Sequence, residues 1–198
     1  SDLSKGAPVA ANMAGGTHHA FKDRGSGFCI FNDLAICAIK AIEDYKYNRV
    51  LIIDLDVHQG DGTASILKDN NKAYTFSAHC KQNFPFKKEA SNTDIEIETG
   101  ADDSTYLNIL RNSLIDLESI ESDIIFFQAG VDTLASDRYG KLLLTAEGLN
   151  ARNEMVFDFA RKRKNPLLIL MGGGYSEPID NTVAAFQDLF IAAAKYSF

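Results

Sequence analysis

The residues best suited to catalysis gather directly after one apolar run, between Asp54 and Gly62. This segment reads Asp-Leu-Asp-Val-His-Gln-Gly-Asp-Gly. Asp56 and His58 are two residues apart, so in an extended chain their side chains project to the same side. A carboxylate and an imidazole at that spacing form half of a metal site, and such ligands without thiolate suit zinc or another divalent transition metal. A single Asp-x-His segment is more often a turn aspartate beside a packed histidine. Here several charged side chains follow directly after a buried strand, where leaving them unpaired is costly, and this favours a metal site.

Two further apolar runs also end in residues that can do chemistry. The run ending at Gln128 is followed by Ala-Gly-Val-Asp132, whose carboxylate could be a third metal ligand or simply a turn acid. The run ending at Met171 is followed by three glycines and Tyr175, whose phenol could donate to a developing oxyanion. A phosphate-binding loop is the alternative for these glycines, but the segment lacks both the P-loop lysine and the G-x-G-x-x-G spacing.

Two of the four histidines, His18 and His19, are adjacent in a glycine-rich segment. Paired imidazoles can act as general base and general acid near neutral pH. A surface pair or the remnant of a tag is the alternative, and the position of the pair well inside the chain argues against a tag. Three protein ligands would leave zinc an open position for water, whose pKa the metal lowers to about 7. Together these groups suit metal-assisted attack on an amide carbonyl.

The elements that must position these residues alternate between short apolar runs and helical stretches. Strands are expected at Arg49–Asp54, Ala73–Ser77, Asp123–Gln128 and Pro166–Met171, with an edge strand at Asp94–Glu98. Helices are expected at Leu34–Tyr45, Tyr106–Leu117, Thr145–Lys164 and Ser176–Ala194, the last two capped by Thr145 and Ser176. Nearly continuous apolar runs are typical of parallel strands buried on both faces. The pattern therefore predicts an α/β fold with its chemistry at the carboxyl ends of the strands.

The composition is that of one globular domain. The chain has 198 residues, of which 45% are hydrophobic and 24% charged, and these values exclude disordered, collagen-like and membrane-spanning classes. Twenty Lys and Arg against 27 Asp and Glu give a net charge of −7, which argues against direct nucleic-acid binding. Three cysteines without a CxxC pair suit a reducing compartment, so we expect a cytoplasmic location, or a nuclear one in a eukaryote. We expect neither a signal peptide nor a membrane span.

Five motifs in order resemble those of the zinc-dependent histone deacetylase family. They are Gly-Thr-His18-His19, Gly27–Asp33, Asp54–Gly62, Ala129–Leu134 and Gly172–Tyr175. Within the family the chain is most similar to class IV and its bacterial relatives, through Gln59, Asp137-Arg138 with Gly140, and Arg152-Asn-Glu154 with Val156-Phe157. The resemblance covers nearly all of the chain. It implies a three-layer α/β/α fold of the arginase/deacetylase type, with residues 1–198 forming a single catalytic domain.

The resemblance also implies a role for each matching residue. The zinc ligands would be Asp56, His58 and Asp132. The catalytic set would be His18, His19, Asp54, Asp61 and Tyr175, with His19 as general base, the two acids as partners of the histidines and the phenol at the oxyanion. The acyl-lysine tunnel would be lined by Phe28, Phe84, Gly27 and Gly173. A structural potassium ion would be bound by Asp54, Asp56, His58 and Ser77.

The function implied is a zinc-dependent amidohydrolase that removes acetyl or longer acyl groups from lysine side chains or from a similar amine. The resemblance also implies that roughly the N-terminal third of the family domain is absent, so that a missing segment or another chain would complete the sheet. Two alternatives remain open. A binuclear manganese ureohydrolase shares the fold class but needs a second cluster of metal-binding acids. A truncated fragment could instead act as a non-catalytic interaction module.

Overall fold

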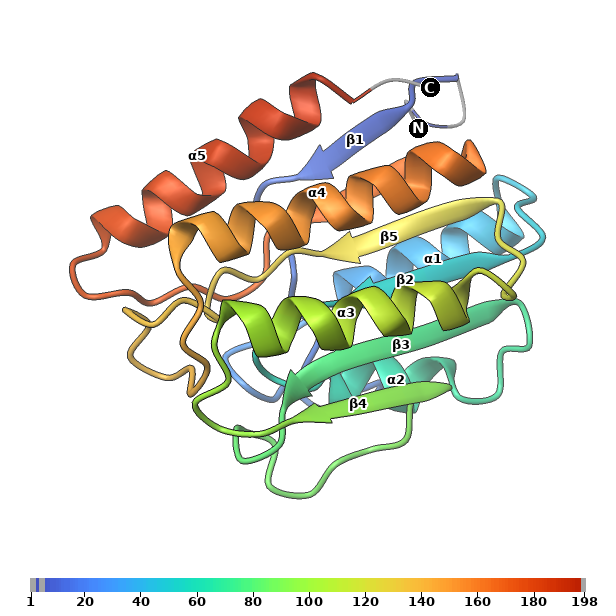
Figure 1. The fold of residues 1–198 in the computed structure, drawn as a ribbon. Coiled ribbons are helices and arrows are strands. Elements are labelled where there is room, and N and C mark those ends of the chain that lie inside the picture. The colour runs from blue at the N-terminus through green and yellow to red at the C-terminus, as the bar shows by residue number, and fades with distance from the viewer. Residues whose placement is uncertain (1–2, 4–5, 197–198) are drawn as a thin grey trace.

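Six parallel strands form one sheet in the order β1-β6-β5-β2-β3-β4 (Figure 1). The computed structural model describes residue 3 and residues 6–196. The strands are β1 (Val9–Asn12), β2 (Val50–Asp54), β3 (Ala73–Cys80), β4 (Thr93–Ile97), β5 (Ile124–Gln128) and β6 (Leu167–Leu170). The arrows of β1, β3, β4 and β5 point the same way in Figure 1, and β2 and β6 pair in parallel with their neighbours, so the carboxyl ends of the strands meet at one edge of the sheet.

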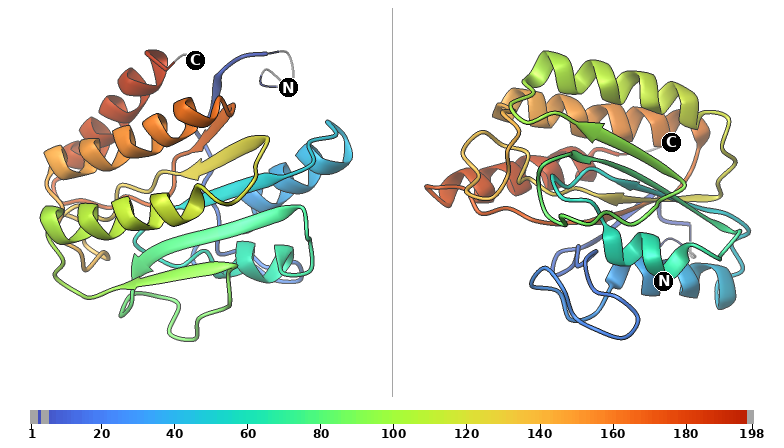
Figure 2. Two further views of the ribbon diagram at one scale, coloured as in Figure 1. Left: turned by 45° about the vertical axis from the view of Figure 1, so that its right-hand side comes forward. Right: turned by 90° about the horizontal axis from the view of Figure 1, so that it is seen from below.

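Helices cover both faces of this sheet, because parallel strands need crossover connections. One face carries α1 (Asp33–Glu43) and α2 (Asp61–Leu67), and the other carries α3 (Asp103–Leu117), α4 (Ala146–Arg163) and α5 (Asp180–Ala194), as the right-hand view in Figure 2 shows. The expected three-layer α/β/α fold is therefore confirmed. None of these helices, within the described part of the chain, is long and apolar enough to cross a membrane.

Two apolar clusters fill the spaces on either side of the sheet. Neighbouring residues of one strand enter different clusters, since side chains alternate across a strand. Ile53 and Phe127 pack on the side of α3, α4 and α5, whereas Ile52 and Phe126 pack on the side of α1. Every residue of β2 and β5 is buried. These central strands are continuously apolar because both of their faces are covered.

Most element boundaries lie close to those expected from the sequence. Strand β4 lies at the sheet edge, as its alternating pattern predicts, and Thr145 caps α4 by accepting from Gly148 N at 3.0 Å. The predicted cap at Ser176 is wrong, because its backbone N donates to Thr182 Oγ1 and α5 begins at Asp180. Strand β3 runs on to Cys80 and α3 begins already at Asp103. The sequence reasoning missed β1 and gave no range for the short helix α2.

The strand order reverses between β2 and β5. From β2 the chain moves outward to β3 and β4, and it then returns to place β5 and β6 on the other side of β2. In open parallel sheets the crevice at such a reversal is the usual ligand site. The segments that follow β2 and β5 carry Asp56 and Asp132, so the topology brings these distant residues together.

Candidate active site

Asp56, His58 and Asp132 converge where the chain leaves β2 and β5. One potential ligand atom from each residue lies within 4.8 Å of the others. His58 Nδ1 is 3.0 Å from Asp56 Oδ1 and 3.1 Å from Asp132 Oδ2. The two aspartates are 1% and 0% exposed. The structure thus brings together the three residues that the sequence proposes as metal ligands.

Close backbone contacts hold the two carboxylates in these positions. Gly173 N donates to Asp56 Oδ2 at 2.8 Å, and Val57 N donates to Asp132 Oδ1 at 2.9 Å. A Cβ atom at Gly130 would lie 2.3 Å from Asp56 Oδ2, and one at Gly173 would lie 2.3 Å from Asp132 Oδ2. Only glycine leaves room for the carboxylates here. One oxygen of each carboxylate is therefore fixed by backbone, and the other faces His58.

The electrostatics of this cluster favour a positive charge among its donor atoms. Burial raises the pKa of Asp56, but the charges of His18 and His58 outweigh it and hold that pKa well below its ordinary value. Burial and the charge of Asp56 raise the pKa of Asp132 to about 7. Burial opposes protonation of His58, yet hydrogen bonds to Asp132 and Asp56 raise its pKa to about 11. A buried set of two carboxylates and one imidazole that demands a cation fits a divalent metal ion such as zinc.

Two aspartate–histidine pairs lie beside the cluster. His18 Nδ1 is 2.7 Å from Asp54 Oδ2, and His19 Nδ1 is 2.7 Å from Asp61 Oδ1. An ionised carboxylate can only accept, so each Nδ1 donates and each Nε2 is left for other partners. His18 Nε2 lies 3.7 Å from Asp56 Oδ1. The structure therefore pairs the two histidines with the two aspartates expected as their partners, His18 with Asp54 and His19 with Asp61.

The two histidines differ in their preferred charge. Burial lowers the pKa of His18, but the nearby charges of Asp54 and Asp56 outweigh it and raise this pKa to about 9. Burial and the charge of His18 lower the pKa of His19 to about 4. At neutral pH one imidazole is thus protonated and its neighbour is neutral. A neutral imidazole can accept a proton, whereas its charged neighbour can donate one.

Polar side chains from the start of α1 and the end of β5 hold the loop that carries the histidines. Asp33, the first residue of α1, accepts from the backbone N of Gly16 and of Thr17, each at 2.8 Å. Gln128, at the end of β5, donates from Nε2 to Gly16 O at 2.8 Å, and Asn32 Nδ2 donates to His18 O at 3.0 Å. The sequence reasoning assigned no role to these residues. A polar glutamine closing an apolar strand was the available signal.

An open cavity of about 560 Å³ lies above the histidines and the acidic cluster. All four residues proposed for the tunnel line it, namely Gly27, Phe28, Phe84 and Gly173. The Phe84 ring packs 5.0 Å from the His19 ring, and the Phe28 ring lies 6.4 Å from that of Tyr175. Tyr139 also lines the cavity, with its ring 5.3 Å from that of Tyr175. Sequence reasoning missed Tyr139, which follows the Asp137-Arg138 pair.

Ser77, proposed as a potassium ligand, lies next to Asp54 in the sheet. The two residues are register partners on β3 and β2. Ser77 Oγ hydrogen-bonds His79 Nδ1 at 2.9 Å, and both side chains are buried. The four residues proposed for this ion therefore share one end of two neighbouring strands.

The chain is similar to a known protein family over most of its length. Residues 3–190 match the family described as Histone deacetylase domain. An uncharacterized protein of Picosynechococcus sp. is 47% identical over 186 residues, covering 93% of this chain and 62% of that protein. Histone deacetylase 2 of Arabidopsis thaliana is 34% identical over 179 residues, covering 88% and 46%. Histone deacetylase 8 of Xenopus laevis is 32% identical over 183 residues, covering 86% and 54%.

A solved structure shares the fold. The crystal structure of the HDA15 HD domain superposes with a TM-score of 0.83 at 22% identity, covering 98% of this chain and 60% of that one. The chain thus spans between 46% and 62% of the length of the three curated relatives. The family match extends over nearly all of the chain and includes both the acidic cluster and the paired histidines. The chain belongs to the histone deacetylase family.

Proposed function

We propose that this chain carries the catalytic centre of a zinc-dependent deacylase, which hydrolyses the amide bond of an acylated lysine side chain or a similar amine. One observation carries the proposal. A buried donor set of two carboxylates and an imidazole opens into the same cavity as a phenol and two histidines, each of which is paired with an aspartate. Because the chain spans only part of its relatives, the proposal concerns the protein in which this chain works.

Asp56, His58 and Asp132 would hold the zinc ion. Their donor atoms are close enough to share one cation, and three ligands leave a coordination position free. When bound, such an ion supplies Lewis-acid polarisation of the amide carbonyl and of a water molecule. Hydrogen bonds from the backbone of Gly173 and Val57 would hold the carboxylates of Asp56 and Asp132 in position to bind the ion.

Proton transfer would fall to the two histidines. Asp61 accepts from His19 Nδ1, which leaves Nε2 of the neutral ring to take a proton from the attacking water. The His19 ring, now protonated, then gives this proton to the leaving amine, while His18, held by Asp54, keeps its own proton and charge. Tyr175 lines the same cavity and would donate its phenolic hydrogen to the oxyanion.

The cavity walls support an extended acyl-amine substrate. Phe28, Phe84 and Tyr139 give the cavity an aromatic lining around the acidic cluster. Such a lining suits the apolar methylenes of a lysine side chain, while the polar groups at the base act on the amide. Phe28 is 88% exposed and has a φ of 65°, so it stands at the rim rather than the base.

The mononuclear centre is favoured over the binuclear alternative. A manganese ureohydrolase needs two neighbouring metal-binding clusters. The described residues contain one cluster of this kind, formed by Asp56, His58 and Asp132. The nearby acids Asp54 and Asp61 are each engaged by a histidine.

Three smaller proposals accompany this function. We propose a potassium ion beside Asp54 and Ser77, supported by their adjacent positions on β2 and β3. We propose that a further segment or another chain completes the sheet at β1, which pairs with β6 alone among the described strands, since the relatives are longer than this chain. We also propose a reducing, cytoplasmic setting, because all three cysteines are free.

The test combines metal analysis with a panel of acyl-lysine and acyl-polyamine substrates. We expect one zinc per chain and hydrolysis that a chelator abolishes and zinc restores. His19→Ala and Tyr175→Phe should each lower kcat by about 10²-fold or more without changing the fold or the metal content. Two metal ions per active chain favour the ureohydrolase, and the absence of chelator-sensitive hydrolysis on every substrate favours the non-catalytic module.

A further inference from the structure

Arg152 is completely buried on α4, although arginine is among the residues least often buried without a charged partner. Within the part of the chain that the structure describes, its guanidinium forms no ion pair with a carboxylate. It hydrogen-bonds to neutral oxygens instead. Nε and Nη2 donate to Asn153 Oδ1 at 3.1 and 2.8 Å. A buried guanidinium that contacts only neutral oxygens is unusual, and the proposed catalytic mechanism gives it no role.

The remaining nitrogen of Arg152 bridges the two segments that carry the metal ligands. Nη1 donates to the carbonyl oxygen of Leu55 at 3.1 Å and to that of Gly130 at 2.7 Å. Leu55 directly precedes Asp56, and Gly130 lies two residues before Asp132. One nitrogen atom therefore ties together the backbones on which both acidic ligands stand.

This bridge lies just past the last ladder contacts between β2 and β5. Their register ends at the Asp54–Gln128 pair, with one further hydrogen bond from Leu55 N to Gln128 O. Beyond that point no backbone–backbone hydrogen bond is seen between the two segments in the described residues, and Val57 N instead donates to the side chain of Asp132 at 2.9 Å. Arg152 supplies a restraint at the place where the ladder stops.

The chemistry of arginine suits this position. Its guanidinium cannot coordinate a metal ion, and it keeps its charge even when buried. Because it contacts carbonyl oxygens, it leaves all four carboxylate oxygens of Asp56 and Asp132 for other partners. Its fixed positive charge also offsets part of the cost of burying those carboxylates.

We propose that Arg152 is a positioning residue of the metal centre, which sets the separation of the Asp56 and Asp132 segments through the carbonyl groups of Leu55 and Gly130. The inference rests on the proposed zinc site but goes beyond it, because it assigns metal affinity to a side chain that touches neither metal nor substrate. Loss of partners outside the ligand set weakens metal binding by about 10- to 100-fold in known sites.

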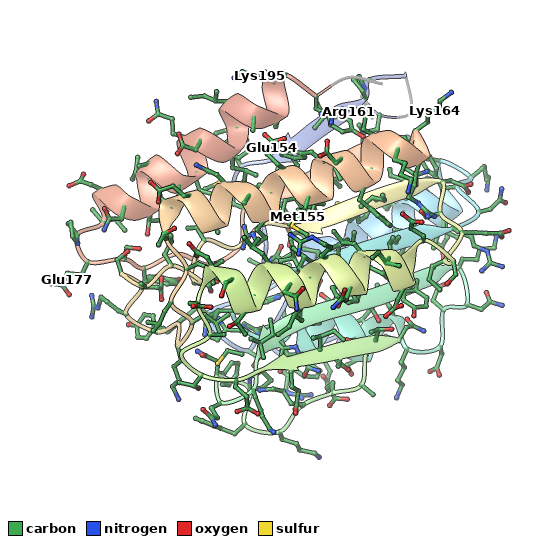
Figure 3. The ribbon with its side chains drawn as sticks, in the orientation of Figure 1. Glu154, Met155, Arg161, Lys164, Glu177 and Lys195 are labelled. Carbon is green, nitrogen blue, oxygen red and sulfur yellow. The ribbon has the colours of Figure 1, made fainter. Side chains whose placement is uncertain are left out.

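The test uses Arg152→Met, which keeps an apolar stem and removes the bridge and the charge, and Arg152→Lys, which keeps a cation but loses the fork to Asn153. Arg161→Met is the matched control, since it removes the same charge from an exposed position further along α4 (Figure 3). Zinc affinity is measured by chelator competition, ligand geometry by the visible spectrum of the cobalt-substituted protein, and folding by thermal melting of the metal-free protein.

We expect Arg152→Met to weaken zinc binding by about 10- to 100-fold and to change the cobalt spectrum, with Arg152→Lys intermediate and Arg161→Met unchanged. Wild-type affinity and spectrum in folded Arg152→Met overturn the proposal. If that variant fails to fold, wild-type affinity and spectrum in Arg152→Lys overturn it instead. Failure of the wild-type protein to bind zinc counts against the proposed function, and is thereby distinguished from failure of the bridge.

Discussion

Replacing Gly173 by alanine tests how tightly the acidic ligands are held. Its φ lies outside the left-handed range, so alanine does not strain the backbone. The added Cβ would lie 2.3 Å from Asp132 Oδ2, whereas ordinary contacts begin at 3.4 Å. The carboxylate must therefore move by about 1 Å, several times the roughly 0.2 Å tolerance of metal–ligand distances. We expect zinc affinity to fall by about 10- to 100-fold, or about 1.4 to 2.8 kcal/mol.

Gly174→Ala is the neighbouring control. Its Cβ would meet the methyl groups of Val131 and Thr182, at 2.6 and 2.9 Å, and no carboxylate. We expect this variant to lose stability but to bind zinc as the wild type does. The assay is chelator competition for zinc, run beside thermal melting of the metal-free proteins. Zinc affinity within twofold of wild type in folded Gly173→Ala would refute the argument that the glycine holds the carboxylate in place.

Two further predictions concern histidines and their partners. Asp61→Asn offers His19 an amide in place of a carboxylate, so the ring can adopt the wrong tautomer. We expect kcat to fall, by up to the roughly 10²-fold that a positioned base contributes, at unchanged zinc content; wild-type kcat would contradict this. Burial lowers the pKa of His79 to about 4, below its ordinary value of 6.5. Between these two pH values His79 therefore binds a proton in the unfolded chain but not in the folded one. Neutral His79 therefore contributes fully to the free energy of unfolding above pH 6.5, and this contribution is lost as pH falls towards 4, by up to about 3 kcal/mol. When the unfolding free energy of the metal-free protein is measured against pH, this loss should be absent in His79→Asn.

The central part of the fold could be predicted because burial on both faces leaves a clear mark on a sequence. The apolar runs around β2, β5 and β6 permit little else than covered parallel strands. Strand β1 leaves no such mark, because its four residues, Val-Ala-Ala-Asn, are small or polar and only partly buried. Its place in the sheet depends on pairing with β6, a contact of residues 158 positions apart, as in Val9 with Leu167.

The residues of the candidate site were also only partly predictable from the sequence. Residue types at strand ends sufficed to propose Asp56, His58 and Asp132, because unpaired charges at such places need a partner. The residues that hold these groups in place could not be predicted in this way, because nothing in the sequence around a glutamine or an arginine shows which distant residue it will contact. Gln128 meets Gly16 across 112 positions, and Arg152 meets Leu55 across 97. Only the folded sheet brings these pairs together.

The loop that carries His18 and His19 lies beside the β1 edge of the described sheet. The loop follows β1, the edge strand, yet its restraints come from elsewhere in the chain. Asp33 of α1 binds Gly16, Gln128 of β5 binds the same residue from the other side, and Gly172 N donates to Gly15 O at 3.3 Å. These contacts come from the first turn of a helix and from the ends of two interior strands, β5 and β6. Among the described residues, the contacts that hold the loop of the paired histidines thus come from α1 and from the interior of the sheet.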